Sequence, residues 1–357
     1  MRTVIIGLPQ VGKTSLFTIL TGQTRQTRLG PTAVQVGVAK VPDARVERLA
    51  ELFRPPKVTH ATVEYADMPA LAKESLADPS YVGALRQGDA FLHVLRLFED
   101  DTVMHAGGGL DAMRDWSNIE TELIVNDLVV VEKRLERVEK DIVRIKKPEL
   151  GKEKELLLSC QQALEAERPL RELELSPEED KLLRGFQFLS AKPMLLVLNL
   201  GESEAGRLAE IESDYRDRWL AGKSKIGVAA VCGSVEAELA ELSPDDAREY
   251  MASYGFEQPG LVRLIQASYS LLGLMSFLTA GETEVRAWTI PANSPAVQAA
   301  GAIHSDFERK FIRAEVIQWD KLVERGGYAG AREHGELRLE GKKYIVQEGD
   351  VLVIRHS

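Results

Sequence analysis

The residues best suited to chemistry form a short loop near the N-terminus, which reads Gly7-Leu8-Pro9-Gln10-Val11-Gly12-Lys13-Thr14. Its two glycines allow successive backbone N–H groups to curl around a phosphate, as in the G-x-x-x-x-G-K-T pattern. In such a loop Lys13 places positive charge against the β- and γ-phosphates, so it serves catalysis as well as binding, and the Thr14 hydroxyl ligates Mg²⁺. Residues 3–6 predict a strand before the loop, and residues 15–20, beginning at Ser15, predict a helix whose N-terminus favours the same anion. The sequence therefore predicts a site for the phosphates of a nucleoside triphosphate.

Asp67 is a second candidate, because it ends the strand predicted over residues 63–66. P-loop enzymes place an acid at such a strand end, where it holds Mg²⁺ through water. The alternative is that Asp67 only forms the turn after the strand. GTPases continue with Asp-x-x-Gly, whose glycine N–H reaches the γ-phosphate, whereas this chain has Ala70 there. Alanine keeps the N–H but restricts the backbone rotation that a switch uses.

The segment Asn199-Leu200-Gly201-Glu202 follows the apolar residues 194–198 and bears on the choice of base. GTPases use Asn-Lys-x-Asp at this point, and the acid accepts hydrogen bonds from guanine N1–H and its amino group. Adenine has no N1–H, and here a longer Glu202 stands in place of Asp and no Lys is present to stack on the base. The segment therefore favours adenine, whose N7 and amino edge Asn199 can bond, although a helix-capping turn is the alternative. Cys232-Gly233-Ser234 falls where a base-contacting loop follows the next strand.

These residues need an alternating arrangement of strands and helices to bring them together. Short apolar runs at residues 4–6, 63–66 and 91–95 are separated in part by helical stretches, and similar runs return at residues 194–198 and 228–231. That alternation is typical of an α/β nucleotide-binding sheet. The sequence thus predicts one such sheet, built from two parts of the chain.

Between these two parts, apolar residues recur every three or four positions, at Leu128, Val131, Leu135, Val138, Ile142 and Ile145. This is the spacing of a coiled-coil seam; residues 148–151 interrupt it, and Leu157, Cys160 and Leu164 resume it. We expect an antiparallel α-helical hairpin, inserted into the first domain and charged on its outer face. Its cations either form a solvated face or meet RNA phosphates. They are Lys133, Arg134, Arg137, Lys140, Arg144, Lys146 and Lys147.

Another change of pattern comes near residue 279, after which strand-like runs dominate at residues 285–290, 311–317 and 351–354. They suggest a compact α+β domain of ordinary size. We therefore expect residues 1–117 and 191–278 to form the nucleotide-binding domain, residues 118–190 the helical insertion, and residues 279–357 a second domain.

Composition limits the classes of function. The 357 residues carry a net charge of −10, which argues against coating nucleic acid through bulk charge. Two cysteines far apart indicate a reducing, cytoplasmic setting, and no apolar run approaches the ~18 residues of a membrane helix. We expect a cytoplasmic monomer with no membrane or DNA partner, whose ligands are Mg²⁺ and ATP, with GTP as the other possibility.

The sequence resembles the Obg-like ATPases of the YchF type over nearly its whole length. The loop at residues 7–13 is similar to that family's Gly-Leu-Pro-Asn-Val-Gly-Lys, and Val41-Pro42-Asp43 and Glu120-Thr121-Glu122-Leu123 also look like family segments. The C-terminal stretches are the most specific. They include Val285-Arg286-Ala287-Trp288-Thr289 and Gln298-Ala299-Ala300-Gly301-Ala302-Ile303-His304-Ser305-Asp306-Phe307.

The resemblance implies a G domain of the translation-factor class, an inserted helical arm and a C-terminal β-grasp domain of the TGS type. It also implies hydrolysis of ATP in preference to GTP, and association with ribosomes or RNA. Family members lack the catalytic glutamine of Ras-type GTPases, and Leu71 stands at the matching position here. A histidine in a mobile loop is proposed to act in its place, and the matching residue is His105. The alternative for His105 is an exposed loop histidine without a catalytic role.

Two segments depart from the family pattern, and both belong to parts that sense the γ-phosphate. The family's switch I threonine aligns with Pro31 or, after a shift, with Thr32, and the segment that follows Asp67 is shorter than in the family. Three functions stay open: an ATPase that acts as a translation-linked switch, a nucleotide sensor that docks RNA or ribosome with negligible hydrolysis, and a metabolic P-loop kinase. The kinase ranks last, because no lid-like arginine cluster is evident.

Overall fold

The computed structural model describes residues 1–23, 34–71, 75–100, 102, 105, 108–145, 147–256 and 258–357. It divides the chain into two compact units. The first comprises Met1–Gly37 and Glu64–Leu271, and the second comprises Val38–Val63 and Leu272–Ser357. Each unit is described by itself below.

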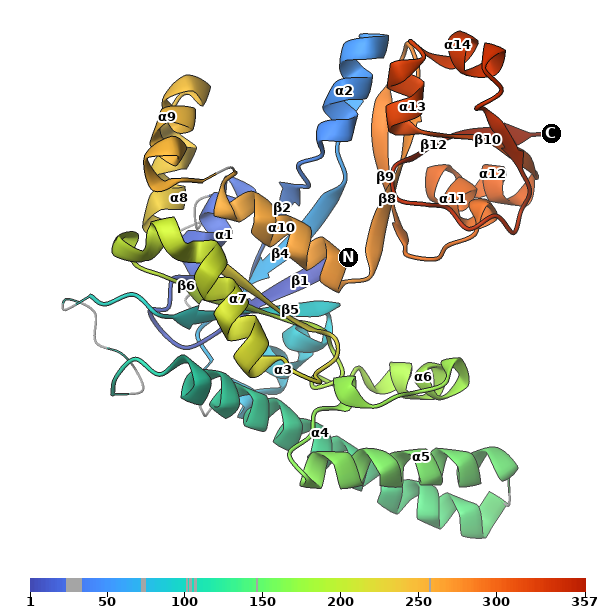
Figure 1. Cartoon of the computed structure of the whole chain (residues 1–357). Helices are drawn as coiled ribbons and strands as arrows, with labels where there is room; N and C mark the ends of the chain where they lie inside the picture. Colours follow the sequence, from blue (N-terminus) through green and yellow to red (C-terminus); the bar gives the residue numbers. More distant parts are fainter. Residues whose placement is uncertain are drawn as a thin grey trace. The chain divides into compact units, whose positions relative to one another are not determined.

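The first unit is built on a sheet in the strand order β2-β4-β1-β5-β6-β7 (Figure 1). Four pairings, β1 with β4 and β5, β5 with β6, and β6 with β7, are parallel. Every residue of β5 and β6 is buried, as expected of central strands covered on both faces. All five apolar runs that predicted strands lie in this sheet. The strands are β1 (Arg2–Ile6), β2 (Gln35–Lys40), β4 (Thr62–Asp67), β5 (Ala90–Arg96), β6 (Met194–Asn199) and β7 (Ile226–Val231).

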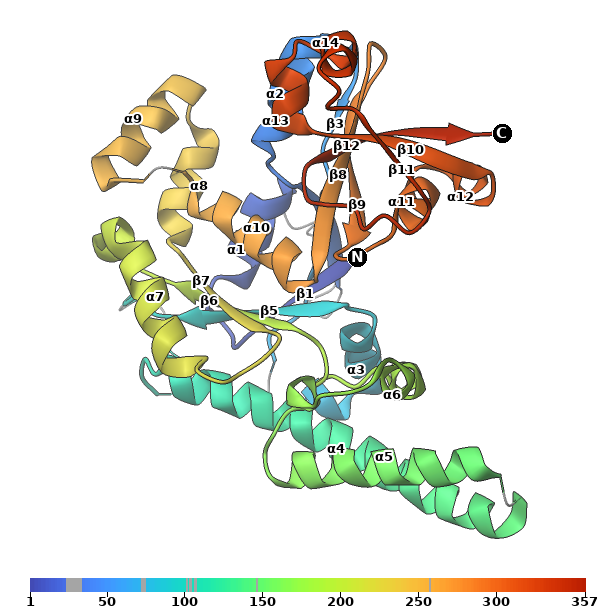
Figure 2. The same ribbon diagram turned by 45° about the vertical axis from the view of Figure 1, so that its right-hand side comes forward.

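Helices cover both faces of this sheet (Figure 2). α3, α4 and α7 pack on one face around the sheet residues Phe91, Leu95 and Leu196, and α1 and α10 lie on the other. Because the strands are parallel, their carboxyl ends meet at one edge, where the loops after β1, β4, β6 and β7 gather. The helices of the first unit outside the arm are α1 (Lys13–Thr21), α3 (Pro79–Arg86), α7 (Leu208–Trp219), α8 (Gly233–Glu241), α9 (Pro244–Tyr254) and α10 (Gly260–Leu271), with two 3₁₀ helices, η1 (Ser75–Ala77) and η4 (Glu202–Arg207).

The inserted hairpin is an arm made chiefly of α4 (Ala112–Ile145) and α5 (Pro148–Glu165). The first part of α4 packs on the sheet through Trp116, Ile119 and Leu123, whereas its later part packs against α5. The predicted seam is present: its members Val131, Leu135 and Val138 and the α5 residues Leu157, Cys160 and Leu164 are buried in one separate core. α6 (Pro177–Leu183), η2 (Leu170–Glu172) and η3 (Arg184–Phe186) complete the arm.

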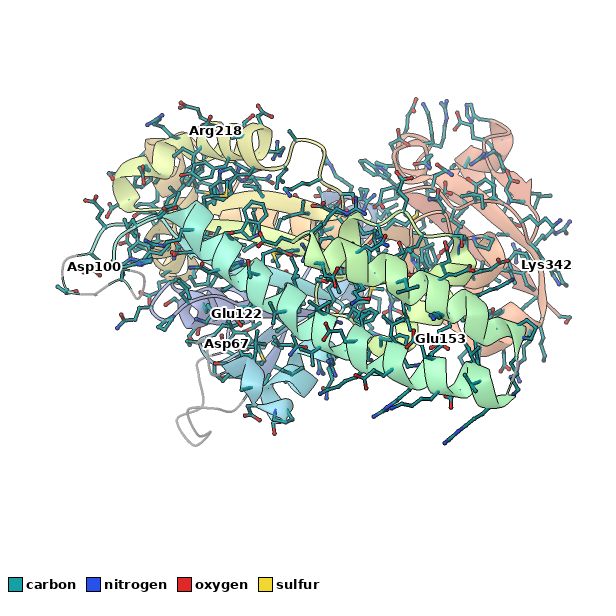
Figure 3. The ribbon with its side chains drawn as sticks, turned by 90° about the horizontal axis from the view of Figure 1, so that it is seen from below. Asp67, Asp100, Glu122, Glu153, Arg218 and Lys342 are labelled. Carbon is teal, nitrogen blue, oxygen red and sulfur yellow. The ribbon has the colours of Figure 1, made fainter. Side chains whose placement is uncertain are left out.

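The predicted interruption of the hairpin at residues 148–151 is wrong in its position. These residues form the first turn of α5, with Pro148 at its start, where the missing N–H of proline costs nothing. Across the hairpin, the Arg134 guanidinium donates to both carboxylate oxygens of Glu153, at 2.7 and 3.0 Å. Figure 3 shows Glu153 on α5, which lies beside the distal part of α4.

Asp127 of α4 ties the arm to the segment that leads back to β6. Its carboxylate is fully buried and accepts hydrogen bonds from Leu189 N at 2.9 Å and from the N–H and hydroxyl of Ser190 at 2.7 Å each. Burial raises the pKa of Asp127 to about 6, although the three hydrogen bonds act in the opposite direction. The hydrogen bonds of Asp127 to Leu189 and Ser190 therefore position the segment that leads into β6.

The second unit is a mixed sheet in the order β11-β10-β12-β8-β9-β3, with α11 packed on one face around Phe277, Ile290 and Val316. Its C-terminal part begins at Leu272, before the boundary predicted between residues 278 and 279, which falls inside β8 (Leu274–Ala280). The remaining elements are β9 (Val285–Pro291), α11 (Ala296–Ile303), α12 (Ser305–Arg309), β10 (Phe311–Gln318), α13 (Trp319–Glu324), α14 (Tyr328–Glu333), β11 (Arg338–Glu340) and β12 (Asp350–His356).

An earlier stretch of the chain also belongs to the second unit, which the sequence pattern did not reveal. Residues 38–63 contribute α2 (Ala44–Phe53) and β3 (Val58–Thr59), and β3 pairs with β9 in parallel. Thr59 Oγ1 donates to Glu284 at 2.8 Å, and Arg45 of α2 pairs with Glu348 at 2.6 Å. A strand of two residues has no periodicity to detect, so only its partner defines it. Across the described ranges, no helix combines the length and the apolar content that a membrane span requires.

His93, in the centre of β5, is the least expected residue of the sheet core. It is fully buried, and neither ring nitrogen has a hydrogen-bond partner among the described residues. Burial, aided by the positive charges of Lys13 and Arg171, lowers the pKa of His93 to about 3. The imidazole is therefore neutral in the folded protein at every pH where the protein works.

We predict that His93→Leu makes the protein less sensitive to acid. An unfolded chain binds a proton at His93 below pH ~6.5, whereas the folded protein does so only near pH 3, so the free energy of unfolding falls as the pH drops through this range. His93→Leu should remove up to ~1.4 kcal/mol of this loss per pH unit. Denaturant unfolding between pH 7.5 and 5 measures the difference. The exposed His334→Leu is the control, and equal pH slopes in wild type and His93→Leu would contradict the prediction.

Candidate nucleotide-binding site

The loop between β1 and α1 has the backbone of a phosphate cradle. Gly7 has φ +148° and Gly12, the N-cap of α1, has φ +95°, both in the region that favours glycine. A Cβ on Gly7 would lie 2.6 Å from the Val94 carbonyl oxygen. Gln10 also adopts a positive φ, of 61°, and is exposed together with Ser15, while Pro9 is half-buried. The loop therefore keeps its curl through residues that the sequence pattern prescribes.

Lys13 lies inside this loop. Its side chain is buried, and Nζ donates to the carbonyl oxygens of Gly7 at 3.0 Å and Leu8 at 2.6 Å. An ammonium group held by carbonyl oxygens is charged and already positioned at the centre of the loop. It is placed to exchange these neutral partners for phosphate oxygens.

Thr14 and Asp67 come together although they are 53 positions apart. The Thr14 hydroxyl donates to Asp67 Oδ2 at 2.9 Å, and Asp67, the last residue of β4, is buried. A hydroxyl and a carboxylate are the hard oxygen donors that Mg²⁺ prefers, so these two residues fit the ion. The structure thus places the two predicted metal ligands side by side.

Asn199, the last residue of β6, links the phosphate loop to the loop after β7. Its Nδ2 donates to Val11 O at 3.0 Å, and its Oδ1 accepts from Gly233 N at 3.1 Å. A Cβ on Gly12 would lie 2.4 Å from Nδ2, so the carboxamide fits only against glycine. Asn199 is buried, and each end of its side chain is bonded to the backbone of a different loop. Its contribution to the site therefore includes holding two loops in register.

The other predicted base-side residues occupy different environments. Leu200 is buried and its N–H donates to Val231 O at 2.8 Å, so it secures the sheet edge. Cys232 is buried and its Sγ lies 3.3 Å from Ser234 Oγ, which is exposed at the start of α8. Glu202 is exposed at the start of η4, and Tyr254 Oη donates to its Oε1 at 2.7 Å. The sequence did not point to Tyr254, which follows Tyr250 by one helical turn.

The segment after Asp67 runs back along the phosphate loop. Leu71 N donates to Gly7 O at 3.1 Å, and the Leu71 side chain is buried in the core below the sheet. The residue that stands for the catalytic glutamine of Ras-type enzymes is therefore part of the core. The switch I positions Pro31 and Thr32, and the switch II residues 72–74, lie outside the described residues.

His105 lies against α4. Its Nε2 is 3.0 Å from Oδ2 of Asp115, and the two side chains are 8% and 3% exposed. Arg114 also donates to Asp115, at 3.0 Å. His105 is therefore not the exposed loop histidine that was the alternative in the sequence. Asp115, in the first turn of α4, could not be predicted as this partner, because only the tertiary contact with His105 defines it.

Similarity to known proteins places this arrangement in a family. A family model, YchF-GTPase_C, described as "Protein of unknown function (DUF933)", matches residues 274–357. The "Ribosome-binding ATPase YchF" of Bacillus subtilis (strain 168) is 40% identical, and the alignment covers 99% of this chain and 98% of the relative. The chain belongs to the YchF family. The "Ribosome-binding ATPase YchF" of Escherichia coli O157:H7 is 38% identical over 98% of this chain and 97% of its own.

Solved structures agree with this membership. The "Structure of the Schizosaccharomyces pombe YchF GTPase" superposes with a TM-score of 0.84 at 26% identity, over 99% of this chain and 97% of that one. The fold is thus the YchF arrangement of a P-loop G domain, a helical insertion and a C-terminal TGS domain, as the sequence predicted.

We predict that Asn199→Ala weakens nucleotide binding about tenfold. The change leaves Val11 O and Gly233 N without their partner, at a cost of ~1–3 kcal/mol, and releases the phosphate loop. Isothermal titration with ATP and thermal unfolding measure the two effects. Asn118→Ala, at an exposed position of α4, is the matched control. Wild-type affinity in Asn199→Ala would show that the loop holds its shape without this bridge.

Proposed function

We propose that this protein binds ATP with Mg²⁺ at the loop from Gly7 to Thr14 and hydrolyses it while associated with the ribosome. The observation that carries the proposal is the convergence of Lys13, the Thr14–Asp67 pair and Asn199 on one loop. The names of the relatives, which are ribosome-binding ATPases, support both the reaction and the partner. A ribosome partner also supports a cytoplasmic location, and we propose a single chain as the working unit.

The phosphates bind to the backbone N–H groups of the loop, at the N-terminus of α1. Lys13 releases the carbonyl oxygens of Gly7 and Leu8 and pairs with the β- and γ-phosphates. Thr14 and Asp67 would hold Mg²⁺, Asp67 through water. The bound ion supplies charge neutralisation at the transferred phosphoryl group. On the base side, Asn199 and Gly233 bring the loop after β7 to the nucleotide, and Glu202 favours adenine over guanine.

Hydrolysis also needs a group that orients water. Leu71 has no polar atom and is buried, so it cannot do this. We assign the role to His105, whose imidazole can polarise a water molecule near neutral pH. Because Nε2 of His105 lies against Asp115, we propose that His105 leaves this contact when it acts on the nucleotide. Catalysis would then depend on a local rearrangement, as in enzymes gated by loops.

A nucleotide sensor with negligible hydrolysis is the second candidate. It is favoured by Ala70 in place of the switch II glycine and by the buried Leu71. Purified protein incubated with ATP or GTP, with and without ribosomes, separates the two. Release of phosphate supports the ATPase, whereas tight binding without release in all four conditions supports the sensor.

We predict that Lys13→Ala lowers the rate of ATP hydrolysis at least a hundredfold, because it removes the positive charge that stabilises the transferred phosphoryl group. Phosphate release under saturating ATP measures this rate, and Lys152→Ala, an exposed lysine of α5, is the control. If Lys13→Ala hydrolysed ATP at the wild-type rate, the reaction would have to take place at a site other than the phosphate loop. A clear preference for GTP would contradict the roles given to Asn199 and Glu202.

The arm offers a surface for ribosomal RNA. Lys133, Arg137, Lys140 and Arg144 are spaced by four, three and four residues, so they share the face of α4 opposite the buried seam, and all four are exposed. None of them forms an ion pair with another described residue. Their neighbour Arg134 is committed to Glu153 inside the hairpin. This stripe of cations is available to phosphates, and we propose that it contacts RNA.

We predict that replacing the four stripe residues by Gln weakens binding to ribosomes and flattens its salt dependence by about three units of log K per log salt, since each phosphate contact contributes ~0.7–0.9. Co-sedimentation at 50–200 mM salt measures both. The control removes four exposed arginines that already form ion pairs with acidic residues three or four positions away in the sequence. They are Arg207, Arg216, Arg218 and Arg248. Equal losses in both variants would mean that net charge, and not the stripe, governs binding.

A further inference from the structure

Glu202 is held by a residue from a different part of the chain. Tyr254, the last residue of α9, donates its hydroxyl hydrogen to Glu202 Oε1 at 2.7 Å, across 52 positions of sequence. The tyrosine ring is itself supported, because it lies edge-on to Tyr250 at 5.2 Å and stacks on Phe256 at 5.7 Å. The contact therefore joins a carboxylate to a hydroxyl group that is placed by aromatic packing.

The neighbouring Tyr250 makes the same kind of contact with a different partner. Its hydroxyl donates to Glu238 of α8. The two tyrosines lie one turn apart on the same helix, and each engages one exposed glutamate. The two hydroxyl groups also interact with each other, and only Tyr254 reaches the segment that begins at Asn199.

We propose that Tyr254 is a specificity-determining residue of the nucleotide site, which positions Glu202 so that guanine is a poor ligand. This inference rests on the proposed function, because it assumes that Glu202 lies beside the base. A carboxylate recognises guanine with two oxygens, which accept from N1–H and from the amino group together. The Tyr254 hydroxyl takes one of the two lone pairs of Oε1 and fixes the direction of the carboxylate. Guanine must displace this charge-assisted hydrogen bond in order to turn both oxygens toward its two donors.

Adenine does not need that displacement. It has no N1–H, so its binding does not require both oxygens of Glu202. The contact with Tyr254 therefore costs GTP affinity and leaves ATP affinity almost unchanged. Discrimination between the two bases then depends on Tyr254, which orients the acceptor, as well as on Glu202 itself.

Tyr254→Phe tests this inference, because it removes the hydroxyl and keeps the aromatic packing. Dissociation constants for ATP and GTP are measured by titration in wild type, Tyr254→Phe and Tyr344→Phe, with thermal unfolding as the check on folding. We expect the ratio of GTP to ATP affinity to rise about threefold to tenfold in Tyr254→Phe, the range of one hydrogen bond. Tyr344→Phe removes a hydroxyl that donates to Asp350 in the second unit, and it should match the wild type.

Glu202→Ala and the double variant Glu202→Ala/Tyr254→Phe show whether Tyr254 acts through Glu202. If it does, Tyr254→Phe changes the ratio in the wild-type background and leaves it unchanged in the Glu202→Ala background. An unchanged ratio in Tyr254→Phe, or an equal change in both backgrounds, overturns the inference. Failure of the proposed function looks different, since neither nucleotide would then bind and Lys13→Ala would have no effect on binding.

Discussion

The carboxamide of Asn199 is the contact on which the geometry of the nucleotide site depends. It is bonded at one end to the phosphate loop and at the other to the loop after β7. These two loops follow different strands, β1 and β7, and are far apart in the sequence. One buried amide, satisfied at both ends, therefore holds the phosphate loop and the loop after β7 in a defined position relative to each other. The glycine at position 12 follows from it, because a side chain there would collide with the amide.

α4 connects the site to the arm because it belongs to two cores. Its first turn carries Asp115, against which His105 rests, and its next turns pack on the sheet. Its distal part forms the core of the arm and displays the cationic stripe. A rearrangement that frees His105 therefore changes contacts of the same helix that would meet the ribosome. A common helix is a physical route by which nucleotide state and ribosome contact can influence each other.

Sequence patterns predicted those parts of the structure that are determined by residues close together in the chain. The phosphate loop, the five predicted strands of the parallel sheet and the seam of the arm all follow from periodicity or from a motif with a fixed backbone shape. The start of α5 was misplaced because proline interrupts a helix and also begins one. Residues 38–63 were predicted to belong to the first domain, because no sequence pattern within them indicates that β3 pairs with β9. The partners of His105 and Glu202 were missed for the same reason: Asp115 and Tyr254 are defined by tertiary contacts.

The phosphate-binding part of the site and its base-binding part therefore differ in how far the sequence alone defines them. On the phosphate side, the proposed ligands are eight consecutive residues and one strand-terminal acid, so a motif and the end of a predicted strand are enough to suggest them. On the base side, Asn199 and Glu202 each depend on a distant partner, Val11 in one case and Tyr254 in the other. A single substitution on α9 can change the surroundings of Glu202 without touching the phosphate loop. Asn199 joins the two sides, whereas the contact between Tyr254 and Glu202 leaves the phosphate loop untouched. If the proposed function holds, base preference can therefore change through Tyr254 while the phosphate loop stays the same.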